Sequence, residues 1–126
     1  EHGQETPDML EIFENNKKWV DAMKEQDPEY FNKLGAVHKP EYLWIGCSDA
    51  RVPANEIMGL GAGEVFVHRN VANMVVNTDM NMNAMLQYAV QYLEVKHIIV
   101  AGHYDCGGVR ASMETKDLGL VENWLG

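Results

Sequence analysis

The fold is decided by the run Tyr42-Leu43-Trp44-Ile45-Gly46, five mostly apolar residues that end directly before Cys47. Two further runs of strand length, residues 64–68 and 98–102, are also mostly apolar, and stretches with helical spacing separate the three. Short apolar runs that alternate with helices are typical of parallel strands joined by right-handed crossovers. The sequence therefore predicts an α/β fold: a parallel β-sheet core with flanking helices.

The helices are predicted from spacing and from start signals. Between the second and third strands, apolar residues recur every three or four positions over residues 80–94, which predicts a helix there. Near the N-terminus, Thr6-Pro7-Asp8 is typical of a helix start and predicts a helix from about Pro7 to Lys24. Asp27-Pro28 predicts a second, short helix that Gly35 ends.

These elements suggest an N-terminal helical arm over residues 1–40 and an α/β core over residues 41–126. A chain of 126 residues suits one domain, and 46% hydrophobic content is enough for a core. We expect the arm to pack on a neighbouring subunit.

Charge and hydropathy exclude several classes of partner. Ten basic and nineteen acidic residues give a net charge of −9, which disfavours binding to nucleic acid. The longest apolar stretch, residues 95–102, is interrupted by Lys96 and His97 and is too short to span a membrane. We expect a soluble protein, cytoplasmic or organellar (chloroplast or mitochondrion), and the sequence does not decide between these compartments.

Two cysteines and a histidine follow the predicted strands. Cys47 comes directly after the first strand, and His103 and Cys106 follow the third. Ligands gather at the carboxyl ends of parallel strands, and two thiolates with one imidazole are a donor set that zinc prefers. Three protein ligands leave a fourth position open for chemistry. A disulfide between Cys47 and Cys106 is the alternative that the sequence leaves open.

A carboxylate and a guanidinium accompany the first cysteine. Asp49 lies two residues after Cys47, and Arg51 two residues further on. Asp49 could compete for the fourth position on a metal, with Arg51 as its restraint. The alternative is an ordinary loop ion pair, which is worth little when exposed.

Three blocks of sequence resemble the β-class carbonic anhydrases. The first is Cys47-Ser48-Asp49-Ala50-Arg51-Val52-Pro53, the second runs from Gly63 to Asn73, and the third is Gly102-His103-Tyr104-Asp105-Cys106-Gly107-Gly108. The resemblance covers about residues 12–125, but members of the family continue beyond that point. We therefore expect an α/β core that is incomplete at its C-terminus, with an uncovered sheet edge, so that a homodimer or larger homo-oligomer is favoured.

The resemblance implies a zinc lyase that hydrates CO2 reversibly to bicarbonate and a proton. It implies Zn²⁺ as the cofactor and makes Asp49 and Arg51 a switch, in which Asp49 takes the fourth zinc position when their pair breaks. His38 stands where the family commonly has a glutamine that hydrogen-bonds substrate across a dimer. The substrate pocket implied by the resemblance consists of His38, Phe66, Val71, Tyr88 and Gly107. Core packing is the alternative for the apolar members of that set.

A second anion site is implied by similarity to the allosteric bicarbonate-sensing subgroup of the family. Its residues would be Trp44, Gly46 and Arg69, the glycine leaving room for the anion and the arginine pairing with it. Trp44 could instead be an ordinary strand residue, and Arg69 could merely brace the sheet.

Two other functions stay open at this stage. Relatives with the same zinc ligands hydrolyse carbonyl sulfide or carbon disulfide. The chain could also be a catalytically weak family member that serves as a structural subunit of a larger assembly. His38 and the short C-terminus favour the structural role, whereas the intact cysteine and histidine blocks oppose it.

Overall fold

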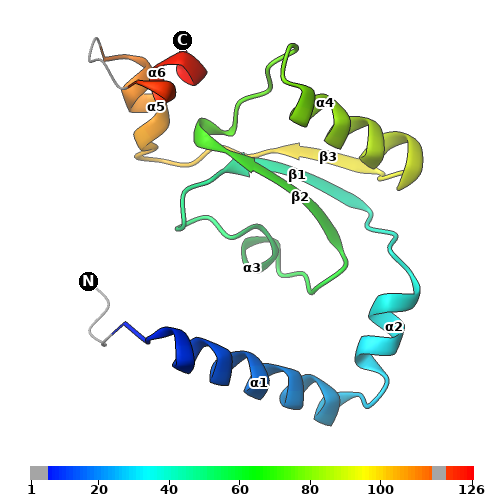
Figure 1. Cartoon of the computed structure of the whole chain (residues 1–126). Helices are drawn as coiled ribbons and strands as arrows, with labels where there is room; N and C mark the ends of the chain where they lie inside the picture. The colour runs from blue at the N-terminus through cyan, green and yellow to red at the C-terminus, as the bar shows by residue number, and fades with distance from the viewer. Residues whose placement is uncertain (1–5, 115–118) are drawn as a thin grey trace. The chain divides into compact units, whose positions relative to one another are not determined.

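The computed structural model describes residues 6–114 and 119–126, and its contacts divide the chain into two units. The first unit reaches Val37 and is helical, and the second begins at His38 and contains the sheet (Figure 1). Among the described residues, we find no helix whose length and hydropathy would let it span a bilayer.

The N-terminal unit contains α1 (Met9–Gln26) and α2 (Tyr30–Ala36). The cap of α1 is Asp8 rather than the predicted Thr6: Asp8 Oδ1 accepts the backbone N–H of Glu11 at 2.9 Å, and aspartate caps a helix as well as a hydroxyl does. None of the α1 residues is buried. The unit is held by an edge-to-face contact between Trp19 and Phe31, whose ring centroids lie 5.6 Å apart.

The sheet of the second unit has three parallel strands in the order β2-β1-β3. They are β1 (Tyr42–Cys47), β2 (Val65–Asn70) and β3 (His97–Val100), each within two residues of its predicted bounds. The predicted parallel sheet with flanking helices and an N-terminal helix is confirmed. Because β1 is central, its five buried residues can be covered from both neighbouring strands.

Helical segments connect and flank the strands. Figure 1 shows α3 and α4 on opposite sides of the sheet. The predicted helix over residues 80–94 is α4, which continues directly into a π-helical turn, η2. The segments of this unit are α3 (Ala54–Met58), η1 (Val71–Asn73), α4 (Met80–Gln87), η2 (Tyr88–Tyr92), α5 (Gly107–Ser112) and α6 (Leu120–Leu125).

The core lies between β1 and the α4–η2 segment. Leu43 and Ile45 of β1 pack against Met82 and Ala89, and all four are at most 2% exposed. Apolar burial of this kind supplies the main stabilising free energy, about 25 cal/mol per Å² of apolar surface. It fixes β1, and therefore the position of Cys47 at the carboxyl end of the strand.

Candidate metal centre

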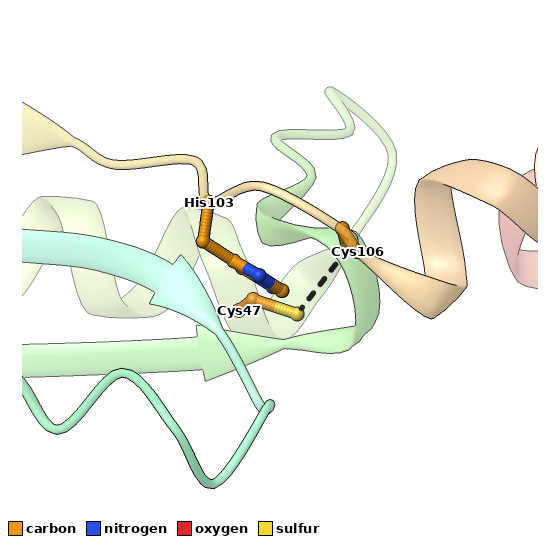
Figure 2. A group of neighbouring side chains, drawn as sticks. All are labelled: Cys47, His103 and Cys106. Carbon is orange, nitrogen blue, oxygen red and sulfur yellow. Dashed lines mark hydrogen bonds between the residues drawn. The ribbon is translucent and has the colours of Figure 1, made fainter.

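The three predicted ligands converge at the carboxyl end of the sheet. Cys47 is the last residue of β1, His103 lies three residues after β3, and Cys106 caps the start of α5. The pairing between β1 and β3 extends one residue beyond the end of β3, through a hydrogen bond from the Ala101 N–H to the Ile45 carbonyl at 2.9 Å. Figure 2 shows the side chains of Cys47, His103 and Cys106 pointing toward one another.

The donor atoms fit one tetrahedral metal ion. The sulfur atoms of Cys47 and Cys106 are 3.7 Å apart, and the ligand atoms of the three residues all lie within 4.8 Å of one another. Two thiolates at about 2.3 Å from a tetrahedral zinc would be separated by about 3.8 Å. Both cysteines are buried and free, so the predicted alternative of a disulfide is not what the structure contains.

The histidine is oriented as a ligand requires. Its Nδ1 lies 2.9 Å from the Tyr104 carbonyl oxygen, which can only accept, so Nδ1 carries the proton and Nε2 has the free lone pair. Nε2 is buried and has no hydrogen-bond partner among the described residues. A buried acceptor without a partner is costly, and a metal ion would satisfy it.

Two of the candidate ligands, Cys47 and His103, influence each other's protonation. Burial by itself would raise the pKa of the Cys47 thiol, but the neighbouring His103 ring, the backbone N–H groups and Cys106 lower that pKa to about 7. The Cys47 sulfur beside the ring, helped by the Tyr104 carbonyl, raises the pKa of His103. The site therefore favours a thiolate at neutral pH, and the thiolate is the form that binds metal.

Asp49 and Arg51 form a close ion pair beside this group. The backbone N–H and Nε–H of Arg51 each donate to Asp49 Oδ1 at 2.9 Å, and Nη2 donates to Oδ2 at 2.6 Å. These bonds hold the pKa of the Asp49 carboxyl well below its ordinary value and raise the pKa of Arg51. Because Oδ2 is also 3.8 Å from His103 Nε2, the carboxylate lies at the edge of the donor set.

Arg69 holds the backbone of the loop that carries Cys47 and Asp49. Its Nε–H donates to the Cys47 carbonyl at 2.7 Å, and its Nη2 donates to the Asp49 carbonyl. A further bond, from the Ser48 N–H to the Asn70 carbonyl at 2.8 Å, continues the β1–β2 pairing into the loop. Sequence spacing predicts either an anion site or a brace for Arg69, but it does not reveal which carbonyls the side chain reaches.

The loop after β2 contacts the ligands from another side. Ala72 has a left-handed backbone (φ 70°), and its N–H donates to the Cys47 sulfur at 3.4 Å. Helix α5 approaches this loop at Gly108, where a Cβ would lie 2.8 Å from Val71 Cγ1 and 3.0 Å from Ala72 Cβ. A Cβ at the preceding glycine, Gly107, would meet nothing within 4 Å, so the close approach is confined to Gly108.

An apolar layer closes over the ligands. Cys47, Ala72 and Cys106 pack with partly buried hydrophobic residues from three other segments, namely Val52, Met74 and Leu125. Helix α6 is tied to the same place by a hydrogen bond from Trp124 Nε1 to the Val71 carbonyl at 2.9 Å.

The predicted pocket residues fall into two groups. Val71 lies in η1 next to Ala72, and Gly107 directly follows Cys106, so both adjoin the ligands. His38, Phe66 and Tyr88 instead form a row, with ring centroids 5.9 Å and 5.8 Å apart. Phe66 pairs with Leu43, four residues before Cys47 on β1, which places the row about 13 Å along the sheet from the cysteine.

Trp44 and Gly46 lie close together on one face of β1. The indole Nε1 of Trp44 is buried and has no hydrogen-bond partner among the described residues. A Cβ on Gly46 would lie only 2.2 Å from that nitrogen, so the absence of a side chain there is a steric requirement. Gly46 pairs with Arg69 in the ladder, so the three residues predicted for a second anion site are neighbours.

A family model and the curated relatives of this chain point to one protein family. A family model described as carbonic anhydrase matches residues 42–126. A carbonic anhydrase of Emericella nidulans is 60% identical over 114 residues, which cover 90% of this chain and 50% of that protein. One from Candida albicans is 41% identical over 119 residues, covering 93% and 42%.

Solved structures agree. A tetrameric β-carbonic anhydrase from Sordaria macrospora superposes with a TM-score of 0.90 at 43% identity, covering 92% of this chain and 59% of that one. A β-carbonic anhydrase of Aspergillus fumigatus gives 0.89 at 41% identity, covering 92% and 56%. The parallel sheet and the arrangement at its carboxyl end are thus those of the β-carbonic anhydrase fold, and the chain belongs to the β-carbonic anhydrase family. It spans about half the length of the curated relatives it matches.

Proposed function

We propose that this chain carries the catalytic site of a zinc-dependent carbonic anhydrase, which converts CO2 and water reversibly to bicarbonate and a proton. The observation that carries the proposal is the convergence of Cys47, His103 and Cys106, with Asp49 Oδ2 3.8 Å from His103 Nε2. The similar proteins named carbonic anhydrase support hydration of CO2 and do not favour a carbonyl sulfide hydrolase or a purely structural subunit.

The residues of the site have separate roles in the proposed reaction. Cys47, His103 and Cys106 would hold the zinc ion, which when bound supplies the Lewis acid that activates a water molecule. Asp49, restrained by Arg51, would accept a hydrogen bond from a water molecule in the site and so orient it toward CO2. If the pair opened, the same carboxylate could take the fourth position itself, because it lies at the edge of the donor set.

The aromatic row of His38, Phe66 and Tyr88 is proposed to line a substrate pocket in a neighbouring copy. In its own chain the row lies about 13 Å along the sheet from Cys47, too far to contact a small substrate at that metal centre. In a homo-oligomer the row of one copy could contact substrate at the metal centre of another copy, and the Sordaria relative is described as tetrameric.

We further propose that Trp44, Gly46 and Arg69 form a bicarbonate site that regulates the enzyme. The Trp44 indole N–H, which has no hydrogen-bond partner in the part of the chain that the structure describes, and the Arg69 guanidinium are donors that an anion requires. If a bound anion displaced the Arg69 side chain, the carbonyls of Cys47 and Asp49 would lose their hydrogen bonds to it. The bicarbonate site would thereby be coupled to the loop that carries Cys47 and Asp49. Rate measurements with added bicarbonate, compared between the parent protein and Arg69→Gln, test the link.

The main proposal is tested by stopped-flow CO2 hydration together with elemental analysis. We expect about one zinc ion per chain and rapid hydration in the parent protein, and loss of most zinc and activity in Cys47→Ser and Cys106→Ser, because serine is a poor zinc ligand. Full zinc content in both variants would show that the ligands are misassigned. Hydrolysis of carbonyl sulfide without CO2 hydration would indicate the alternative reaction.

A further inference from the structure

Arg51 has an acceptor outside the Asp49 pair. Its Nη2 donates not only to Asp49 Oδ2 but also to the backbone carbonyl of Asp105, at 3.1 Å. Asp105 is 54 residues away in sequence and lies between two of the metal ligands, His103 and Cys106. This hydrogen bond therefore connects the loop after β1 with the loop after β3.

The backbone of Asp105 is in the left-handed region, with φ 54°. Outside glycine this conformation is uncommon, and aspartate and asparagine adopt it more readily than other residues do. The direction of a carbonyl group follows from the backbone torsions of its own residue. The left-handed conformation at Asp105 is thus what aims its carbonyl at the guanidinium of Arg51.

The carboxylate of Asp105 contributes much less. It lies 3.4 Å from Arg110 Nη2, and the two side chains are 80% and 62% exposed. An exposed pair at that distance contributes little to stability, because water and salt screen it. The side chain of Arg51 is itself 65% exposed, so water competes for its N–H groups and a fixed backbone acceptor matters.

We propose that Asp105 is a positioning residue for the Asp49–Arg51 pair and acts through its left-handed backbone rather than through its charge. By holding Arg51 from the opposite loop, the Asp105 carbonyl keeps the guanidinium where it can retain Asp49. The inference rests on the proposed function, because the pair matters for the reaction only if the chain is a carbonic anhydrase.

The test separates the effect of the backbone conformation at position 105 from the effect of the side-chain charge there. Asp105→Gly and Asp105→Asn tolerate a positive φ and keep the carbonyl, whereas Asp105→Val, with a β-branched side chain, disfavours that conformation. Arg110→Gln removes the exposed ion pair alone and is the matched control. The primary readout is the water-exchange rate of the Arg51 Nε–H in ¹H–¹⁵N NMR spectra of the intact protein, with and without zinc, assigned by its loss in Arg51→Lys.

We expect the Arg51 Nε–H to exchange at the parent rate in Asp105→Gly, Asp105→Asn and Arg110→Gln. In Asp105→Val we expect exchange about tenfold faster, equivalent to about 1.4 kcal/mol, because a guanidinium released from the Asp105 carbonyl at Nη2 also opens its Nε–H bond to Asp49 more often. The kcat for CO2 hydration should fall in that variant while its zinc content is unchanged. If Asp105→Val does not fold, Asp105→Ala provides a milder version of the same change.

Parent-like exchange in the folded Val or Ala variant would overturn the inference and leave the proposed function intact. Fast exchange in Asp105→Asn or Arg110→Gln would also overturn it, because charge rather than backbone would then hold Arg51. Absence of CO2 hydration in the parent protein would instead overturn the proposed function, while the exchange rates would still decide whether Asp105 positions Arg51.

Discussion

The carboxylate of Asp49 has two competing partners, the guanidinium of Arg51 and any cation held by the neighbouring thiols. Arg51 reaches it through three N–H groups, and the low pKa of Asp49 shows how strongly the carboxylate is held as an anion. The balance between these partners is set by individual side chains, so substitutions at single residues test it most directly.

Removing the guanidinium should separate metal binding from catalysis. In Arg51→Ala the three ligands are untouched, so zinc should remain bound, but Asp49 would be free to take the open position. We expect CO2 hydration to fall by about 10²-fold, within the range for removal of a positioned acid–base group. Stopped-flow rates and elemental analysis on one preparation measure both quantities. Near-parental activity would mean that Arg51 does not control Asp49.

Metal affinity should depend on pH with a definite sign. The pKa of Cys47 is lowered to about 7, and the pKa of His103 is raised by the neighbouring Cys47 sulfur and the Tyr104 carbonyl, so both groups take up protons as the pH falls. Protons compete with zinc for these atoms, and the affinity should therefore decrease as the pH is lowered below about 7. Competition with a chelator across this range provides the measurement. A flat profile would contradict the assignment of the thiolate and imidazole as ligands.

His38 should adjust catalysis without being essential for it. The side chain is exposed and its ring lies 5.9 Å from that of Phe66. The role that the resemblance implies for it is a hydrogen bond to substrate, which a glutamine amide could also donate. We expect His38→Gln to maintain or raise the hydration rate, measured beside His97→Gln, in which the altered histidine stacks on Tyr42 instead. A large loss confined to His38→Gln would assign this histidine a role of its own, such as proton transfer.

Among the secondary structure elements, the strands were predictable and the loops between them were not. Continuous apolar runs are typical of strands buried on both faces, and all three predicted strands are present. The short α3 was missed because five residues give too little periodicity, and the π-helical end of the predicted helix over 80–94 leaves no trace in the spacing. The convergence of Cys47 with Cys106 followed from topology, but the reach of Arg69 and the backbone of Asp105 depend on torsions that residue types do not reveal.

The contact between α5 and η1 gives a prediction about stability. Gly108→Ala would place a methyl group 2.8 Å from Val71 Cγ1 and should destabilise the fold by about 1–3 kcal/mol. Gly107→Ala is the matched control: it meets nothing within 4 Å, and alanine gains helix propensity of about 1 kcal/mol there. Urea unfolding at fixed zinc concentration compares the two. Equal stabilities would mean that α5 can move away from the loop.

For the whole molecule, the apolar surface on the third strand favours association. Ile98 and Val100 of β3 are 52% and 56% exposed, and β3 is an edge of the sheet. Uncovered edges and apolar patches promote pairing with other chains or segments. We expect light scattering to give a mass above that of one 14.2 kDa chain, and Ile98→Lys to weaken the association. A stable, fully active monomer would contradict this prediction.

The wide sequence separation of the two thiols has a consequence for the order of folding. Cys47 and Cys106 lie 59 residues apart, so an ion bound to both would act as a removable cross-link around a large loop of chain. By the entropy estimate for closing such a loop, a permanent bridge would restrict the unfolded chain by about 4 kcal/mol. Pairing of β1 with β3 brings the two segments together, so we expect the bridge to form most readily after that pairing. We therefore expect the metal to bind late in folding, when it would stabilise a sheet that has already assembled rather than direct its assembly.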